Sequence, residues 1–214
     1  MPTQIKICGL SMPETLDAAV DAGASHVGLV HFAKSPRHVT LDDAAKLRRR
    51  VPEGVKVVLL TSALQPAELE AAYLAVRPDV IQFHGNETVE WMALVRKLMG
   101  VETWRAVGLK ERATLDRAQR FVGQVDRVLF DAPAKALPGG NGVAFQWEIL
   151  DGYEHPMDWA LAGGLTPNNV GDAIARTGAP LVDTSSGVET APGVKDIALI
   201  RAFCDAVRAA DANP

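Results

Sequence analysis

Two residues that can exchange protons with a substrate each stand at the end of an apolar, strand-like run. Cys8 closes the run 4–8 and Asp131 closes the run 127–131. In barrels of alternating strands and helices, catalytic side chains lie at the carboxyl ends of the strands. Cys8 is therefore our candidate general base and Asp131 our candidate general acid. The alternatives are a buried structural cysteine and a solvated loop or helix-capping carboxylate.

Both groups need an altered pKa for these roles. A thiol is mostly protonated at neutral pH, because its usual pKa is about 8.5. Cys8 therefore needs a stabilised thiolate or a cationic substrate beside it, and Lys6, on the same strand face, is a candidate stabiliser. Asp131 must keep its proton, so burial or a negative neighbour must raise its pKa. The second cysteine, Cys204, lies in a helical pattern beside Phe203 and is interpreted as core packing.

The elements that must position these residues alternate along the whole chain. Short apolar runs predict eight strands, at residues 5–8, 26–30, 55–60, 80–83, 103–107, 127–130, 159–162 and 181–183. Helical patterns with capping residues separate them, at 13–22, 41–50, 66–76, 87–99, 111–122, 167–176 and 196–209. Runs without strict alternation are typical of strands that are covered on both faces.

This repeat pattern predicts an α/β fold, a TIM barrel with a closed eight-stranded parallel sheet, in a single domain over residues 1–214. An open doubly wound sheet is the alternative, but eight strand–helix repeats favour closure. The segment 131–150, rich in proline and glycine, is predicted to be a long functional loop with only a short helix around 145–150.

Composition excludes several classes of protein. The net charge of −4 and pI near 5.7 argue against a nucleic-acid binder. No apolar stretch reaches the roughly 20 residues of a membrane span, and no signal sequence opens the chain. Two distant cysteines predict neither a disulfide framework nor a structural zinc site. We expect a cytoplasmic enzyme or binding protein that is a monomer, with a homodimer as the alternative.

An ordered set of motifs marks a resemblance to a known family. The motifs are Lys6-Ile7-Cys8-Gly9, Lys34-Ser35-Pro36-Arg37, Gln82-Phe83-His84-Gly85, Phe130-Asp131, Gly139-Gly140-Asn141-Gly142, the run 162–170 beginning Ala162-Gly163-Gly164, the run 182–189 and the run 192–196. Each motif is moderately specific, whereas the ordered set, over nearly the whole chain, is highly specific. The chain resembles the phosphoribosylanthranilate isomerases of tryptophan biosynthesis.

The resemblance implies an Amadori rearrangement of N-(5-phosphoribosyl)anthranilate, an aldosylamine, to an aminoketose. The ring oxygen of the furanose receives a proton, the ring opens to a Schiff base, and loss of the C2 proton leads to the ketone. One general acid and one general base suffice for this chemistry. We therefore expect no cofactor and no metal, and a phosphorylated small molecule as substrate.

The resemblance also implies the binding residues. Arg37 is the expected clamp for the anthranilate carboxylate, which a guanidinium meets with two parallel hydrogen bonds. Asp183 is expected to bind the ribose or the amine of the substrate, or else to order the phosphate loops, and His84 to line the pocket. The expected phosphate cradle follows strands seven and eight and consists of Gly163, Gly164, Ser185, Ser186 and Gly187.

Three other functions were weighed. The histidine-pathway ribotide isomerase has a similar scheme but uses two aspartates, so Cys8 argues against it, although activity on its substrate stays open. A sugar-phosphate sensor without catalysis would have lost the acid or the base, and both are present. A redox role lacks a resolving cysteine near Cys8 in sequence.

Overall fold

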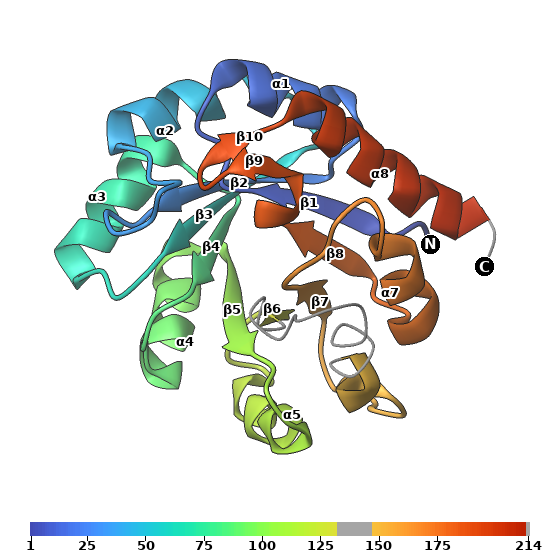
Figure 1. Ribbon diagram of the computed structural model, residues 1–214. Coiled ribbons are helices and arrows are strands. Elements are labelled where there is room, and N and C mark those ends of the chain that lie inside the picture. Colours follow the sequence, from blue (N-terminus) through green and yellow to red (C-terminus); the bar gives the residue numbers. More distant parts are fainter. Residues whose placement is uncertain (132–146, 213–214) are drawn as a thin grey trace.

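The computed structural model describes residues 1–131 and 147–212. Eight parallel strands form a closed barrel in chain order, as predicted (Figure 1). The strands are β1(Gln4–Cys8), β2(His26–His31), β3(Lys56–Thr61), β4(Val80–Phe83), β5(Glu102–Gly108), β6(Arg127–Asp131), β7(Trp159–Ala162) and β8(Leu181–Thr184). A small antiparallel pair, β9(Glu189–Ala191) and β10(Val194–Lys195), follows β8.

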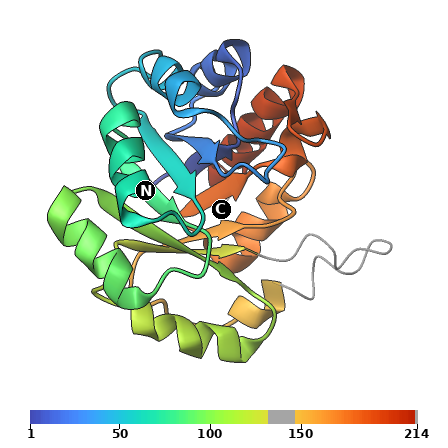
Figure 2. The ribbon, with the colours of Figure 1, turned by 90° about the vertical axis from the view of Figure 1, so that its left-hand side faces the viewer.

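Helices cover the outside of the barrel (Figures 1 and 2). They are α1(Pro13–Asp21), α2(Leu41–Arg48), α3(Pro66–Val76), α4(Val89–Met99), α5(Arg112–Ala118), α7(Val170–Thr177) and α8(Ile197–Ala212), with 3-10 turns η1(Gln119–Phe121), η2(Glu148–Leu150) and η3(Ser186–Val188). In the part of the chain just described, no helix is long and apolar enough to span a membrane.

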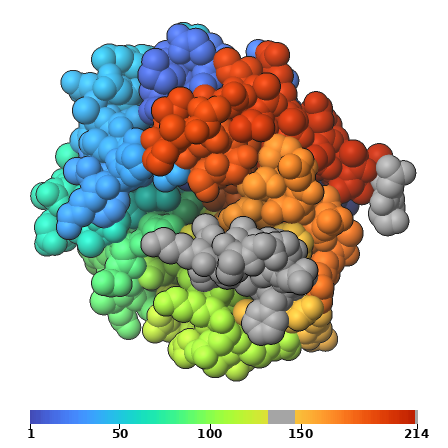
Figure 3. Space-filling view, in the orientation of Figure 1, coloured from blue at the N-terminus to red at the C-terminus, as the bar shows by residue number. Residues whose placement is uncertain are grey.

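The two ends of the chain are held together at the barrel's closure. β1 pairs with both β2 and β8, and α8 packs against α1 (Figures 1 and 3). Thr3 donates hydrogen bonds from its backbone N–H (2.8 Å) and its hydroxyl (2.7 Å) to the carboxylate of Asp211. Closure thus depends on contacts between residues about two hundred positions apart.

Apolar side chains fill two separate regions. The larger one lies between the sheet and the helices, where Ile7, Val27 and Leu161 are fully buried. The smaller one fills the inside of the barrel and includes Val58, Trp104 and Leu129. Because both faces of each strand are covered, the strands need apolar residues on both sides. The runs without strict alternation in the sequence therefore correspond to the observed strands.

Helix ends agree with the predicted capping residues at some sites and differ at others. The predicted cap Thr40 accepts a hydrogen bond from the N–H of Asp43 at 3.1 Å. The helix predicted from residue 87 begins at Val89 instead, where Thr88 is the cap and accepts from the N–H of Trp91 at 3.2 Å. The helix predicted from residue 167 begins only at Val170, so that boundary was wrong. The reason is a turn in which the side chain of Asn169 accepts from the N–H of Thr166 (2.8 Å) and donates to the carbonyl of Gly164 (3.0 Å).

The predicted helix 111–122 is shorter and ends as a 3-10 turn at Phe121. Of the short helix expected around 145–150, the turn Glu148–Leu150 is observed, and the earlier part lies outside the described residues. The same holds for the motif Gly139-Gly140-Asn141-Gly142 and for most of the predicted long loop.

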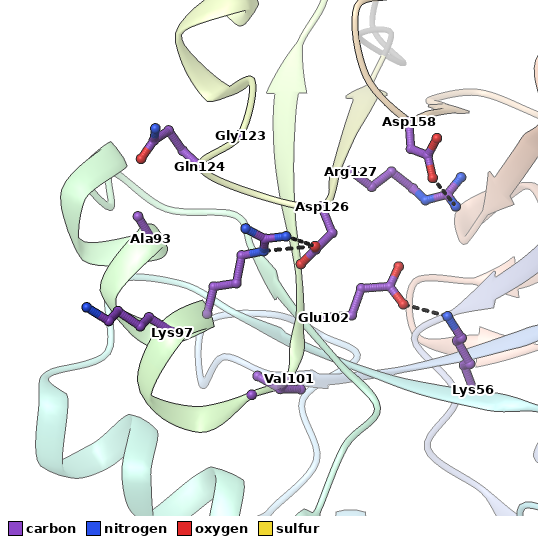
Figure 4. A pocket seen from close by; sticks show the side chains of 12 residues that line it. Lys56, Ala93, Lys97, Val101, Glu102, Gly123, Gln124, Asp126, Arg127 and Asp158 are labelled. Atoms are coloured by element: carbon purple, nitrogen blue, oxygen red, sulfur yellow. Dashed lines mark hydrogen bonds and ion pairs between the residues drawn. The ribbon is translucent and has the colours of Figure 1, made fainter.

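Ion pairs line the amino-terminal end of the barrel, around a hollow of about 900 Å³ (Figure 4). Lys56 pairs with Glu102 at 2.5 Å, and Arg127 approaches Asp158 at 3.6 Å. A third pair joins Arg96 to Asp126 at 2.7 Å. None of the predicted site residues lies in this hollow, whose charges are mostly matched within the protein itself.

Candidate active site

A second cavity, of about 630 Å³, opens at the carboxyl ends of the strands. It brings together all of the residues predicted from the sequence. Its lining includes Cys8, Arg37, His84, Asp131, Gly163, Gly164, Asp183, Ser185, Ser186 and Gly187. Residues separated by up to 179 positions in the sequence therefore face one space, on the end of the barrel where catalytic side chains of this fold are placed.

The thiol of Cys8 packs against the backbone of β2 at Gly28, which has no side chain. Cys8 ends β1 and is only 5% exposed, and its register partner on β2 is Gly28. A Cβ atom at position 28 would lie 2.9 Å from Sγ of Cys8, too close for any side chain. The carbonyl of Cys8 accepts a hydrogen bond from the hydroxyl of Ser185 at 3.0 Å. The strand end is thus tied directly to the loop after β8.

Burial raises the pKa of the Cys8 thiol, against the opposing effect of two lysines. Lys6 lowers that pKa most among the neighbouring charges, Asp183 raises it, and Lys195 lowers it. Lys6 is completely buried and donates to Asp183 at 2.8 Å. The pKa of Lys6 is raised, because Asp183 and Cys8 outweigh the effect of its burial. Burial thus outweighs the two lysines, so the free site favours the thiol over the stabilised thiolate that the sequence analysis called for.

Asp131 has the opposite requirement, a raised pKa, and its pKa is shifted in that direction. It ends β6, and burial raises its pKa above the usual value. Asp183 raises that pKa further, while His84 and Lys6 oppose the shift. The shift extends the pH range over which the carboxyl group is neutral, and the neutral form is the one that can donate a proton. His84 itself is exposed at the rim of the cavity.

Arg37 is held rigidly before any ligand arrives. Its Nε and Nη2 atoms donate to the two carboxylate oxygens of Glu189, at 2.7 Å and 2.6 Å. Within residues 1–131 and 147–212, its Nη1 has no hydrogen-bond partner. Gly9 makes room for the side chain, because a Cβ atom there would lie 2.5 Å from Cδ of Arg37. Gly9 also has a φ of +78°, which favours glycine.

The two glycine-containing loops after β7 and β8 pack against each other. Gly163 and Gly164 have φ angles of +86° and +66°. A Cβ atom at Gly187 would lie 1.8 Å from the carbonyl oxygen of Leu165, so only glycine fits. The hydroxyl of Thr184 donates to that same oxygen at 2.7 Å. The loops therefore form one rigid concave surface with backbone groups close to the cavity.

Sequence reasoning missed several residues of this site. Gln82 also lines the cavity and is 1% exposed, and its Oε1 has no partner in the described part of the chain. A glutamine inside the apolar run 80–83 was the available signal. Glu189 and Lys195 stood in the recognised motifs, but no role was assigned to them. In residues 1–131 and 147–212, no group of three acidic, cysteine or histidine side chains is placed to hold a metal ion.

The closed parallel barrel, with its cavity of titratable side chains at the carboxyl ends of the strands, is that of a (βα)8-barrel enzyme. The family model described as N-(5'phosphoribosyl)anthranilate (PRA) isomerase matches residues 5–206. The chain belongs to this family, as the motifs predicted.

Individual relatives agree with this assignment. The N-(5'-phosphoribosyl)anthranilate isomerase of Erythrobacter litoralis is 65% identical over 206 residues, which cover 96% of this chain and 99% of that protein. TrpF from Jonesia denitrificans has a TM-score of 0.84 at 33% identity, over 99% of this chain and 100% of that one. The phosphoribosyl anthranilate isomerase of Thermotoga maritima has a TM-score of 0.84 at 30% identity, over 97% and 99% of the two chains.

A further solved relative carries a ligand. This phosphoribosyl anthranilate isomerase, 28% identical with a TM-score of 0.79 over 97% of this chain and 99% of that one, is in complex with reduced 1-(o-carboxyphenylamino)-1-deoxyribulose 5-phosphate.

Proposed function

We propose that this protein converts N-(5-phosphoribosyl)anthranilate to 1-(2-carboxyphenylamino)-1-deoxyribulose 5-phosphate by an Amadori rearrangement. The observation that carries the proposal is the placement of Cys8 and Asp131 at the ends of β1 and β6, facing one cavity. The raised pKa of Asp131 supports the role of the acid as well. The ligand bound by the solved relative is a reduced form of this product.

In the proposed first step, Asp131 gives its proton to the furanose ring oxygen. The C1–O bond breaks, and the electron pair of the nitrogen forms a C1=N double bond, which leaves a cationic Schiff base and a carboxylate on Asp131. Burial of Asp131 supports this role, because a raised pKa increases the fraction of the carboxyl group that carries a proton to donate.

The reacting form of the enzyme is the fraction in which Cys8 is already ionised and Asp131 is protonated. In the second step, the Cys8 thiolate of this form removes the proton from C2. The electron pair of the C–H bond forms a C1=C2 double bond, and the iminium nitrogen becomes neutral. The resulting enolamine tautomerises to the aminoketone, so the overall reaction is an isomerisation without a net gain or loss of atoms. Because burial raises the pKa of Cys8, the cationic Schiff base, together with Lys6, stabilises the thiolate when it is needed.

Binding follows from the remaining groups. Arg37 presents its Nη1 to the anthranilate carboxylate, and the backbone of Gly163, Gly164 and Gly187 with the Ser185 and Ser186 hydroxyls receives the phosphate. Oδ1 of Asp183 is buried and unpartnered in the described part of the chain, so a hydroxyl or amine of the substrate can donate to it. His84 lies at the rim of the cavity, and we propose no proton-transfer step for it.

A fluorescence assay with freshly prepared phosphoribosylanthranilate tests the proposal. We expect the substrate fluorescence to disappear with the wild type and with Cys204→Ala, but not with Cys8→Ala or Asp131→Asn. Cys204 is a matched control, because it is also a fully buried cysteine but lies in α8, outside the cavity. Absence of turnover by the folded wild type would refute the proposed reaction, and full activity of Cys8→Ala would refute the role of the base.

A further inference from the structure

The hairpin of β9 and β10 carries two buried charges that the proposed reaction does not use. The side chains of Glu189 and Lys195 are only 4% and 1% exposed, although the hairpin lies on the surface beside β1 (Figure 1). Lys195 donates to Oε1 of Glu189 at 2.6 Å. Burying an ion pair costs desolvation energy, and such a pair contributes only modestly to stability on average. The position of this pair therefore points to a role in the site.

Both carboxylate oxygens of Glu189 accept hydrogen bonds from Arg37. The same Oε1 receives Nε of Arg37 (2.7 Å) and Nζ of Lys195 (2.6 Å), while Oε2 receives Nη2 of Arg37 (2.6 Å). Burial alone would raise the pKa of Glu189, but the two cations outweigh it and hold that pKa below the usual value. Glu189 is thus a permanent anion that fixes the plane of the guanidinium.

Lys195 extends this contact to the loop after β8. Its Nζ donates to the carbonyl of Ser185 at 2.8 Å and to the hydroxyl of Ser185 at 3.1 Å. That hydroxyl donates in turn to the carbonyl of Cys8. One chain of charge-assisted hydrogen bonds therefore connects Arg37 to the loop after β8.

The backbone makes the same connection. Gly193, at the tip of the hairpin, lies against the loop that carries Arg37, since a Cβ atom at Gly193 would lie 2.5 Å from the carbonyl oxygen of Pro36. Gly193 also has a φ of +84°. The hairpin is therefore seated between two loops that line the cavity, the one that carries Arg37 and the one after β8.

We propose that Glu189 and Lys195 are positioning residues that set the separation between the carboxylate clamp at Arg37 and the phosphate loop at Ser185. The inference rests on the proposed function, because it takes these two places as the ends of the substrate. It assigns to the hairpin the selection of substrates that have a carboxylate and a phosphate at the matching distance. Glu189 acts through Arg37, and Lys195 acts through Ser185.

The test measures binding at the carboxylate clamp and binding at the phosphate loop with separate probes. Reduced 1-(o-carboxyphenylamino)-1-deoxyribulose 5-phosphate probes both ends, and inorganic phosphate probes the cradle alone. We expect Glu189→Gln to raise Kd for the reduced product and KM for the substrate about tenfold or more, with kcat changed less than about threefold. Its Kd for inorganic phosphate should stay within about twofold, whereas Lys195→Met should raise that Kd.

A double-variant cycle shows whether Glu189 acts through Arg37. In an Arg37→Ala background, adding Glu189→Gln should raise Kd for the reduced product no further. The matched control is Glu87→Gln, because Glu87 is also 4% exposed and pairs with a partly buried arginine, Arg105, outside the cavity. This variant should melt at a lower temperature but bind the reduced product as the wild type does.

Three outcomes would overturn the inference: an unchanged Kd in Glu189→Gln, full additivity in the cycle, or the same loss of affinity in Glu87→Gln. If Glu189→Gln fails to fold, Glu189→Asp keeps the charge but withdraws it from Arg37, and it should show the same rise in Kd. Failure of the wild type to turn over phosphoribosylanthranilate would instead count against the proposed function, since the cycle is measured by binding.

Discussion

Nζ of Lys6 lies 2.8 Å from Oδ2 of Asp183, and the two side chains are 0% and 8% exposed. They are register partners on β1 and β8, where the barrel closes, and both point into its interior. A lysine that is completely buried cannot be solvated, so its charge depends on this carboxylate. The pair therefore contributes both to closure of the barrel and to the field around Cys8.

Removal of one partner should be strongly destabilising. Asp183→Asn leaves the charge of Lys6 buried and uncompensated, and we expect a loss of about 3–5 kcal/mol in the free energy of unfolding. Urea denaturation monitored by tryptophan fluorescence measures it. The double variant Lys6→Met, Asp183→Asn should recover a large part of the loss. A double variant as unstable as the single one would show that shape, and not charge, determines stability at this place.

The pH dependence of kcat/KM should show a plateau between two breaks. Asp131 must be protonated and Cys8 ionised, yet the raised pKa of the thiol lies above that of the carboxyl group. Between the two pKa values, the gain in thiolate with rising pH is cancelled by the loss of the acid. Activity should fall only below the pKa of Asp131 and above that of Cys8. Steady-state rates from pH 4 to pH 10 would measure both breaks, and a tenfold rise per pH unit that continued without a plateau up to a single break at the pKa of Cys8 would contradict the assignment of Asp131 as acid.

The contact between the two phosphate loops should tolerate no side chain. In Gly187→Ala, the new Cβ would lie 1.8 Å from the carbonyl oxygen of Leu165, so one loop must move. We expect a rise in KM of about tenfold or more, because misplaced donors lose charge-assisted hydrogen bonds to the phosphate. Gly171→Ala in α7 is the control, since its Cβ would meet an ordinary contact at 3.9 Å. Normal kinetics of Gly187→Ala would argue against a rigid cradle.

His26 should make the fold sensitive to mild acid. Burial lowers the pKa of His26 to about 3, and the cations Lys56, Arg127 and Lys6 contribute. Between pH 6.5 and that value, the unfolded chain binds a proton that the folded protein does not, so stability decreases as the pH falls. The slope for one such group is about 1.4 kcal/mol per pH unit.

Urea denaturation at pH 7 and pH 5 provides the measurement. His26→Asn should lose less stability than the wild type between these pH values, by about 2 kcal/mol if the slope of a single histidine applies. Other titrating groups are common to both proteins, so their effects cancel in the comparison. Equal losses in the two proteins would show that His26 is protonated in the folded state.

The barrel was predictable because its determinants are local. Apolar runs such as 26–30 and 80–83 correspond to β2 and β4, and the capping residue Thr40 marks a real helix start. The strand-end argument also placed Cys8 and Asp131 on the same cavity. Parallel strands all end on one side of a barrel, so order along the chain was enough for this inference.

The pairing of charges was not predictable in the same way. Arg37 and Glu189 are separated by 152 positions, and nothing in either local sequence names the other as partner. The predicted start of α7 was wrong for a related reason. The side chain of Asn169 competes with the helix for the backbone of Thr166. Such contacts depend on tertiary placement and on side-chain geometry, neither of which periodicity encodes.

The ion pairs at the two ends of the barrel differ in their access to water. At the amino-terminal end, Lys56 and Arg96 keep 49% and 45% of their side chains exposed, whereas Lys6 and Lys195 keep 0% and 1%. Dissolved ions screen exposed charges over about 8–10 Å, but they hardly reach buried ones. A change in salt concentration should therefore alter the strength of the ion pairs at the amino-terminal end of the barrel, while the electric field at Cys8 stays nearly constant.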